Sequence, residues 1–279
     1  MRSDRPVLDL GQIDAVLFDL DGVVTETASV HAAAWKRTFD DYLERRGARC
    51  DEEQPPFDIE TDYKRYVDGR SRSDGARAFL ESRGISLPLG DRNDPPGSET
   101  VSALAQRKDD DYRHRLATDG AKPFESTVAL LRVLRSRGIR TALFSASRNC
   151  VDVIEAAGIR DLFDAKVDGV DAEELGLPGK PDPAIVLEAA RRVGVGPERA
   201  AVVEDAIAGV EAGRRGGFGL VVGIDRTGNG DGLRSAGADV VVADLAVLRV
   251  EPDPGAAGGD LDPADGNRAA GGRRIPGDG

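Results

Sequence analysis

A short apolar run ends in two carboxylates and a glycine at residues 15–23 (AVLFDLDGV). Its β-branched and aromatic residues are typical of a strand buried on both faces of a parallel sheet. Because ligands of such sheets bind at the carboxyl ends of strands, we expect Asp19 and Asp21 at the mouth of the sheet. Two carboxylates there repel each other unless a cation or a proton lies between them, and Mg²⁺ suits an all-oxygen site. The alternative to a metal site is that these residues form a polar turn that simply ends the strand.

The rest of the chain predicts the sheet to which this strand belongs. Strand patterns recur at residues 140–145, 165–167, 200–204, 219–223 and 239–242, and helices are predicted at 126–137, 149–157, 182–193 and 206–215. Strands and helices in alternation indicate a parallel sheet with right-handed crossovers. The predicted fold class is therefore α/β, with a Rossmann-like doubly wound parallel sheet as its core.

A helical segment interrupts this alternation directly after the first strand. Helices are predicted at 28–46, 60–67, 72–83 and 99–117, separated by loops rich in proline or acidic residues. We therefore expect an α-helical cap domain over residues 28–118, inserted into an α/β core made of residues 13–27 and 119–250. Residues 1–12 are predicted to be a flexible terminus and residues 251–279 a disordered tail.

Composition narrows the classes of partner and compartment. The net charge of −12 argues against nucleic acid and anionic membranes as partners, but it leaves room for a small phosphorylated substrate in a local positive pocket. Cys50 and Cys150 match no disulfide framework or metal spacing, which favours the reducing cytosol. We see no secretion signal and no membrane-length apolar run, so we expect a cytoplasmic protein, monomeric or dimeric.

Polar side chains follow the predicted strands at several points. Asp19 and Asp21 end the first strand, Ser145 with Ala146 and Ser147 ends the second, Lys180 precedes a helix, and Glu204 and Asp205 end a later strand. Parallel strands bring these ends to one edge of the sheet. Each group has a simpler explanation as a helix cap, a solvated lysine or surface acids, but their shared placement at strand ends favours one site.

These residue types suit phosphoryl transfer. Asp19 can attack phosphorus to form an aspartyl-phosphate, and Asp21 can move the proton of the bridging oxygen. Ser145 and the amides that follow it can bind phosphoryl oxygens, while Lys180 supplies a compensating charge. A single Mg²⁺ is expected on the carboxylates of Asp19, Glu204 and Asp205 and on the carbonyl oxygen of Asp21.

The combination resembles the haloacid dehalogenase superfamily over residues 14 to about 245. The segments that carry the resemblance are Asp19-Leu20-Asp21-Gly22-Val23, Ser145-Ala146-Ser147, Gly179-Lys180-Pro181 and Val203-Glu204-Asp205. A cap inserted directly after the first of these segments is similar to that of the helical-cap subclass. The resemblance implies a phosphotransferase whose nucleophile is Asp19.

Within that subclass, residues 19–35 (DLDGVVTETASVHAAAW) resemble the β-phosphoglucomutase family. The resemblance implies that Thr27 and His31 form a hinge that couples cap closure to the placing of the general acid/base. Trp35 shares a helix face with them. Its ring is expected to lie in the cap core, and it is also a candidate wall of the substrate site.

The cap and one core loop supply further residues by the same resemblance. Gly69-Arg70-Ser71-Arg72 resembles the loop whose arginine holds a distal phosphate, which makes Gly69 and Arg72 candidates, and Lys108 resembles a substrate-binding lysine. In the core, Ser147 and Asn149 are implied to contact sugar and phosphate. The chain departs from the family at Arg148, where lysine is expected, and at Asp109, where asparagine is expected.

The resemblance implies a Mg²⁺-dependent mutase that interconverts β-glucose 1-phosphate and glucose 6-phosphate. Its intermediates would be an aspartyl-phosphate and glucose 1,6-bisphosphate, which would also activate the enzyme. A mutase must bind a bisphosphate in both orientations and therefore needs a second cationic site, which Arg72 and Lys108 would supply. A phosphatase for trehalose 6-phosphate or a hexose phosphate is the first alternative, and a non-catalytic domain on the same fold is the second.

Overall fold

The computed structural model describes residues 6–50 and 53–251. Its main sheet has six parallel strands in the order β4-β3-β2-β5-β6-β7, with the bounds β2 (Ala15–Asp19), β3 (Arg140–Phe144), β4 (Ala165–Val167), β5 (Ala200–Glu204), β6 (Leu220–Ile224) and β7 (Val240–Val242). The order grows outward on both sides of β2, which is the arrangement of a doubly wound sheet. The predicted fold class is confirmed.

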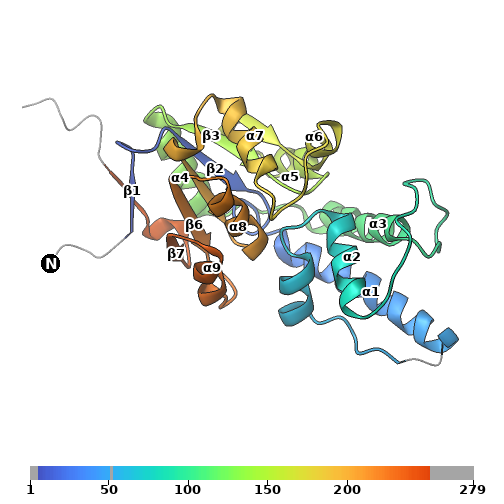
Figure 1. Cartoon of the computed structure of the whole chain (residues 1–279). Coiled ribbons are helices and arrows are strands. Elements are labelled where there is room, and N and C mark those ends of the chain that lie inside the picture. The colour runs from blue at the N-terminus through green and yellow to red at the C-terminus, as the bar shows by residue number, and fades with distance from the viewer. Residues whose placement is uncertain (1–5, 51–52, 252–279) are drawn as a thin grey trace, which may run out of the picture.

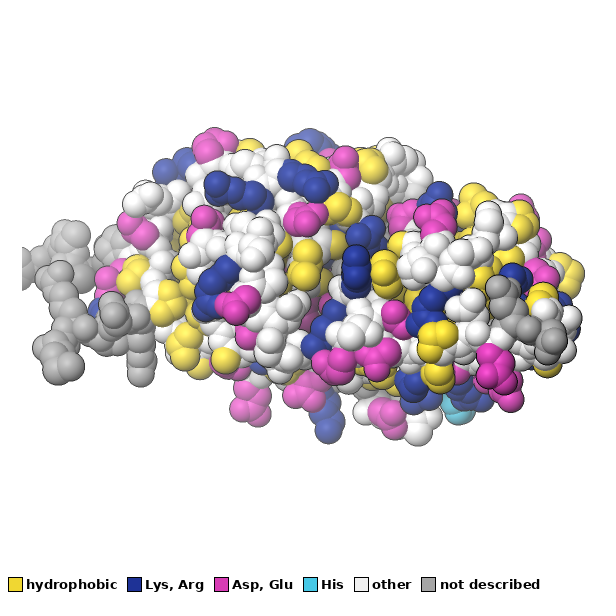
Figure 2. Space-filling model, turned by 60° about the horizontal axis from the view of Figure 1, so that its bottom comes forward, with side chains coloured by type: hydrophobic (Ala, Val, Ile, Leu, Met, Phe, Trp, Pro, Cys, Tyr) yellow, Lys and Arg dark blue, Asp and Glu magenta, His cyan; other side chains and the backbone are white. Residues whose placement is uncertain are grey.

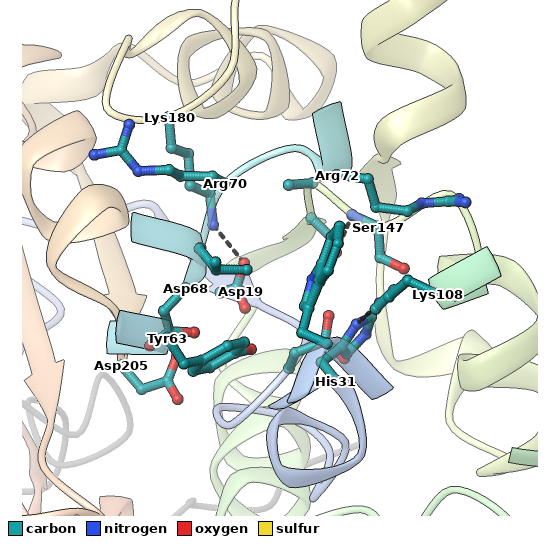
Figure 3. Close-up of a pocket in the computed structure, with 16 residues that line it drawn as sticks. Asp19, His31, Tyr63, Asp68, Arg70, Arg72, Lys108, Ser147, Lys180 and Asp205 are labelled. Carbon is teal, nitrogen blue, oxygen red and sulfur yellow. Dashed lines mark hydrogen bonds and ion pairs between the residues drawn. The ribbon is translucent and has the colours of Figure 1, made fainter. Parts of the chain in front are cut away.

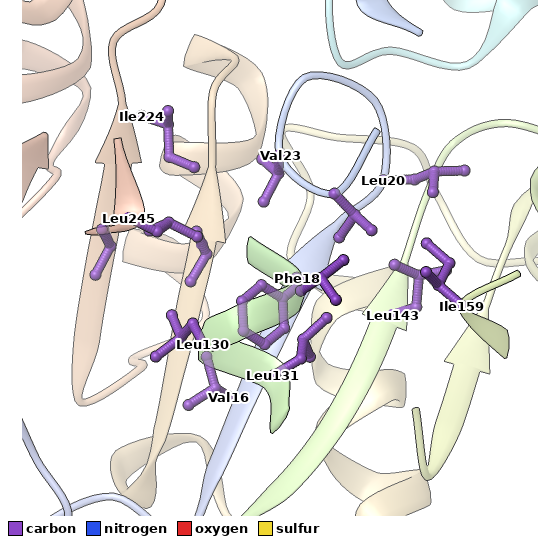
Figure 4. Close-up of a cluster of buried hydrophobic side chains, with 14 of the residues drawn as sticks. Val16, Phe18, Leu20, Val23, Leu130, Leu131, Leu143, Ile159, Ile224 and Leu245 are labelled. Carbon is purple, nitrogen blue, oxygen red and sulfur yellow. The ribbon is translucent and has the colours of Figure 1, made fainter. Parts of the chain in front are cut away.

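Strand β2 has helices on both of its faces because its side chains alternate between them. Val16 and Phe18 pack with α4 (Glu125–Ser136) and α5 (Cys150–Ala156) in one hydrophobic cluster, part of which Figure 4 shows. Leu17 points into the opposite cluster, against α7 (Ala184–Val193), α8 (Ile207–Arg215) and α9 (Gly230–Ala236). Every residue of β2 is buried, so the carboxylate of Asp19 is fixed by a strand that cannot shift without opening two cores.

The cap is built by α1 (Ala28–Cys50), the π-helix η1 (Ile59–Val67), α2 (Arg72–Ser82) and α3 (Val101–Asp119). These helices lie beside the core as a unit of their own (Figure 1). Their interior is aromatic: the ring of Phe39 lies 4.7 Å from Trp35, 5.0 Å from Phe57 and 4.3 Å from Phe79. The cap therefore has its own hydrophobic core, which lets it act as a rigid body.

The prediction of a flexible terminus over residues 1–12 is wrong where the structure describes it. Strand β1 (Val7–Asp9) pairs in parallel with β8 (Arg249–Glu251), and Leu8 is buried in the main cluster. The apolar side chain of Leu8 supplies the burial that a frayed segment lacks. Glu251, predicted to begin the tail, ends β8, while residues 1–5 and the rest of the tail lie outside the described residues.

Several short elements complete the core. They are the helix α6 (Gly169–Glu174) and the single turns η2 (Arg160–Leu162), η3 (Pro197–Arg199) and η4 (Leu245–Val247). Acidic and basic side chains are interspersed over the face shown in Figure 2. Cys50 is exposed and Cys150 is buried, and the two are not bonded to each other. Within the described ranges, every helix is too short or too polar to cross a membrane.

Candidate active site

A pocket of about 60 Å³ lies between the carboxyl ends of the strands and the cap (Figure 3). It opens toward a cleft of about 600 Å³ with which it shares Arg72, Ala146 and Lys180. Most of the predicted site residues line the pocket: Asp19, Asp21, His31, Trp35, Gly69, Arg72, Lys108, Ser145, Ala146, Ser147, Lys180 and Asp205. The other three predicted residues, Thr27, Asn149 and Glu204, lie behind this wall and bond to residues in front of them or beside them.

Lys180 connects the two acidic strand ends. Its ammonium group lies 2.6 Å from Oδ1 of Asp19 and 2.5 Å from Oε1 of Glu204, and only 2 % of its surface is exposed. Burial opposes the charge of Lys180, but the two carboxylates outweigh it and raise the pKa of the lysine. Lys180 is thus a fixed positive charge next to the predicted nucleophile, and not a solvated loop lysine.

Three acids at the strand ends have a donor set that fits a hard cation. Oxygens of Asp19, Glu204 and Asp205 lie within 4.8 Å of one another. Burial raises the pKa of Asp19 well above its usual range against the effect of Lys180, and burial together with Asp68 and Glu204 raises that of Asp205. A further positive charge would let these groups ionise, which is what a Mg²⁺ ion on oxygen ligands supplies. Glu204 also accepts from the amide of Ala206 at 2.7 Å.

Gly22 makes this cluster possible. Its φ of +84° lies in the left-handed region, and a Cβ built on it would lie 1.8 Å from Oδ2 of Asp205. Only glycine combines this backbone conformation with such a close approach. The glycine after the two aspartates therefore lets the β2 loop and the β5 loop meet.

Asp21 faces the cap and not the acidic cluster. Its Oδ1 accepts a short hydrogen bond from Thr27 and lies 3.3 Å from Nε2 of His31. Burial works to raise the pKa of Asp21, but His31, Thr27 and Lys108 prevail and lower it. The pKa of His31 is also lowered, first by burial and then by Lys108. Asp21 is therefore ionised and in contact with the hinge residues Thr27 and His31, and it is able to accept a proton.

The cationic side of the pocket belongs to the cap. Figure 3 shows the guanidinium of Arg72 and the side chain of Lys108 on the side of the pocket away from Lys180. Lys108 contacts Nδ1 of His31 at 2.5 Å and lies 4.7 Å from the ring of Tyr112. Burial, and next the charge of Arg72, lower the pKa of Lys108 to about 7. The pocket is thus positive at both ends, with Asp19 and Asp21 between.

The loop after β3 has the form of an anion cradle. Ser145 is buried, and its Oγ accepts from the amide of Ser147 at 3.0 Å. The Oγ of Ser147 in turn accepts from the amide of Asn149 at 3.2 Å. Asn149 is buried behind this loop and does not line the pocket, and its contact with substrate stays a prediction. Trp35 both stacks on Phe39 and lines the pocket, which joins its two predicted roles.

Sequence reasoning missed four residues that the cap brings into the pocket: Tyr63, Val67, Asp68 and Arg70. The cap loop can approach because Gly69 has a φ of +71° and a Cβ on it would lie 2.9 Å from that of Ala206. Burial, and next Glu204, raise the pKa of Asp68 to about 7. Asp68 directly precedes the glycine of the recognised loop, but nothing in its sequence surroundings indicates that it meets the acids of the core.

Comparisons with known proteins agree with this geometry. A family profile described as haloacid dehalogenase-like hydrolase matches residues 13–217. A protein of Mycobacterium bovis named β-phosphoglucomutase is 47% identical over 85% of this chain and 92% of its own length. A β-phosphoglucomutase of Bacillus subtilis is 32% identical over the same shares. The crystal structure of a β-phosphoglucomutase from Clostridium difficile superposes with a TM-score of 0.64 at 26% identity, covering 84% of this chain and 92% of that one.

A helical cap over acidic strand ends, with a buried lysine and a serine loop between them, is the arrangement that the sequence led us to expect of a phosphotransferase. The chain belongs to the haloacid dehalogenase-like hydrolase family, and within it to the β-phosphoglucomutases. It is therefore an enzyme, which argues against the alternative of a non-catalytic domain.

Proposed function

We propose that this enzyme is a Mg²⁺-dependent β-phosphoglucomutase that interconverts β-glucose 1-phosphate and glucose 6-phosphate. The observation that carries the proposal is one pocket with cations at both ends, Lys180 on the core side and Arg72 with Lys108 on the cap side. A bisphosphate requires two such sites, whereas hydrolysis of a monoester requires one. The names of the relatives at 47% and 32% identity support the same substrate class.

The chemistry follows from the positions of two aspartates. Asp19 carries the phosphoryl group, supplied at first by the bisphosphate. Asp21 takes the proton from the 6-hydroxyl of β-glucose 1-phosphate, which attacks the aspartyl-phosphate; the bond from phosphorus to Asp19 breaks and the 1,6-bisphosphate forms. After the bisphosphate has turned, a carboxylate oxygen of Asp19 forms a bond to the phosphorus on O1 while the bond from that phosphorus to O1 breaks, and Asp21 gives O1 the proton, so that glucose 6-phosphate leaves and the aspartyl-phosphate is restored. Mg²⁺ held by the carboxylates of Asp19, Glu204 and Asp205 and by the Asp21 carbonyl would neutralise charge on the phosphoryl oxygens.

Cap closure explains why the sugar, and not water, would accept the phosphoryl group. Asp21 bonds to Thr27 and lies next to His31, both at the start of the cap, so its orientation depends on the closed hinge. The cap side chains that line the pocket, among them Arg72 and Lys108, cover the reacting centre and limit the access of water. Proton transfer would then be available only when a sugar has closed the cap.

Phosphorus NMR tests the proposal directly. Purified protein with Mg²⁺, β-glucose 1-phosphate and a trace of the 1,6-bisphosphate should form glucose 6-phosphate with little free phosphate. A parallel sample with a chelator should form none. Free phosphate without isomerised sugar would instead favour a phosphatase of trehalose 6-phosphate or a hexose phosphate, which the hydrolase name of the family keeps as the second candidate. We expect the enzyme to be a cytoplasmic monomer or dimer.

The distal site should separate mutase from hydrolase activity. Replacing Arg72 by alanine should lower mutase kcat/KM on the order of 100-fold, or about 2.7 kcal/mol, because a charge-assisted pair with phosphate is lost. Hydrolysis of p-nitrophenyl phosphate, which has no second phosphate, should change by less than about threefold. Arg77→Ala is the matched control, since Arg77 lies on the same helix and pairs with Asp74 at an exposed site. Equal losses in both reactions would contradict the clamp.

Affinity for the bisphosphate should fall as pH rises through neutrality. The pKa of Lys108 is about 7, so its charge is present below that pH and is lost above it. Calorimetric titration of an Asp19→Asn variant should show Kd increasing by roughly tenfold between pH 7 and 9, where the phosphates are already dianions. Lys108→Arg should flatten the profile, because arginine stays charged over this range. A flat profile with Lys108 present would refute the assignment.

A further inference from the structure

A buried carboxylate of the cap has no part in the chemistry proposed above. Asp109 lies on α3 with 3 % of its surface exposed, and it borders the 600 Å³ cleft and not the catalytic pocket. Its Oδ2 lies 3.0 Å from Nη1 of Arg72 and 3.2 Å from Nε of Arg113, and its Oδ1 accepts from Nδ2 of Asn149 at 2.7 Å. Both oxygens are therefore in use, as a buried carboxylate requires.

The three partners of Asp109 come from three different elements. Arg72 begins α2, Arg113 lies on α3 with Asp109, and Asn149 belongs to the core, directly before α5. Arg113 also donates to Oδ1 of Asn149 at 3.1 Å, which closes the network across the interface between cap and core. Asp109 therefore connects a cap arginine to a core loop.

On the core side, that loop is the anion cradle. The amide of Asn149 donates to Ser147, whose own amide donates to Ser145. A continuous path of hydrogen bonds and one ion pair thus runs from Arg72 through Asp109 and Asn149 to Ser145. This path connects the two proposed phosphate sites. Because it crosses from the cap to the core, it requires the cap to lie against the core.

Asp109 also offsets the cost of placing Arg72 in this position. Burial lowers the pKa of Arg72, and Asp109 is the first group that opposes this effect. The guanidinium of Arg72 is held by one carboxylate, and the side chain remains 18% exposed and lines both the pocket and the cleft. An arginine that is already oriented loses less conformational freedom when it binds a phosphate.

We propose that Asp109 is a positioning residue that orients Arg72 for the distal phosphate and ties it to Asn149, so that the distal site is complete only in the closed enzyme. The inference rests on the proposed function, because it takes Arg72 to be the group that holds the second phosphate. The inference explains why this chain has aspartate at position 109, where the family resemblance leads us to expect asparagine. A carboxylate can bind Arg72 through one oxygen and Asn149 through the other.

A second polar contact between cap and core provides a matched control. Arg92 of the cap pairs with Glu173 of α6 at 2.7 Å, and both side chains are 57% exposed. An exposed pair of this kind contributes little, because its charges are screened and solvated. Arg92→Gln removes a contact across the same interface without touching Asp109, Arg72 or Asn149.

A double-mutant cycle tests the proposal. Asp109→Ala should lower mutase kcat/KM on the order of 10- to 100-fold, the effect of misplacing a binding group, while hydrolysis of p-nitrophenyl phosphate stays within about twofold of wild type. In an Arg72→Ala background the same change should cause no further loss, because Asp109 acts through Arg72. Arg92→Gln should leave both activities unchanged. If Asp109→Ala does not fold, Asp109→Leu removes both oxygens with a side chain of similar shape, and the same losses are expected.

The outcomes separate the two proposals. A wild-type enzyme that does not isomerise the sugar phosphate overturns the proposed function and this inference together. An active wild type with an equally active Asp109→Ala variant overturns the inference alone. If Asp109→Ala lowers mutase activity and ester hydrolysis equally, or if its effect on mutase kcat/KM adds fully to that of Arg72→Ala, Asp109 has only a structural role. Either result also overturns the inference.

Discussion

Replacing Asp19 by asparagine is expected to abolish both isomerisation and ester hydrolysis, with a loss of at least about 10⁴-fold in kcat. Asparagine has almost the same shape but no oxygen that can form the phosphoenzyme. The fold should be retained, because the change removes one of several crowded carboxylates: burial, with Glu204 and Asp21 adding to it, already raises the pKa of Asp19. Phosphorus NMR and the unfolding temperature together measure the two effects.

Asp14→Asn is the matched control for this experiment. Asp14 directly precedes the same strand, β2, but lies at its opposite end, where it pairs with Arg199 at an exposed site. Its replacement should leave turnover within about twofold of wild type, since surface ion pairs contribute little. Turnover by the Asp19 variant above about a hundredth of the wild-type rate would exclude Asp19 as the nucleophile, whatever the control shows.

Replacing Lys180 by methionine should damage activity and stability together. Methionine fills the volume but leaves the carboxylates of Asp19 and Glu204 buried without their common partner. Removing one member of a buried ion pair costs about 3–5 kcal/mol of unfolding free energy, and turnover should fall by at least about 10³-fold as the phosphate loses its compensating charge. Denaturant unfolding with a chelator present measures the first quantity.

The lost stability should depend on pH with a definite sign. Burial already raises the pKa of Asp19 against the effect of Lys180, so without Lys180 folding is opposed wherever Asp19 must ionise. Stability should therefore recover as pH falls and a proton neutralises Asp19. Lys166→Met is the control, because Lys166 also bridges two acids, Asp168 and Asp171, but remains 33% exposed. If both variants lose the same stability at every pH, burial of Lys180 is not the cause.

Local sequence determined the fold and the catalytic centre to a large extent. The run from Ala15 to Asp19 can be assigned as a central strand because each of its apolar residues needs a buried face. The order of strands then places the acids of β2 and β5 and the serine after β3 at one edge, since parallel strands share the direction of their ends. The glycine after the aspartates is visible in the sequence, but the close approach of Asp205 that requires it is tertiary.

Tertiary structure alone decided which side chains meet across the cap boundary. Asp68 and Arg70 enter the pocket, and Asp109 binds Arg72 and Asn149, although Asp109 and Asn149 lie 40 positions apart. The pairing of β1 with β8 likewise joins the two ends of the described chain. Periodicity reports which face of an element is buried, and a motif reports local backbone geometry. Neither contains the angle at which a helical cap closes on a sheet, and that angle determines the partners of every charged residue on the interface.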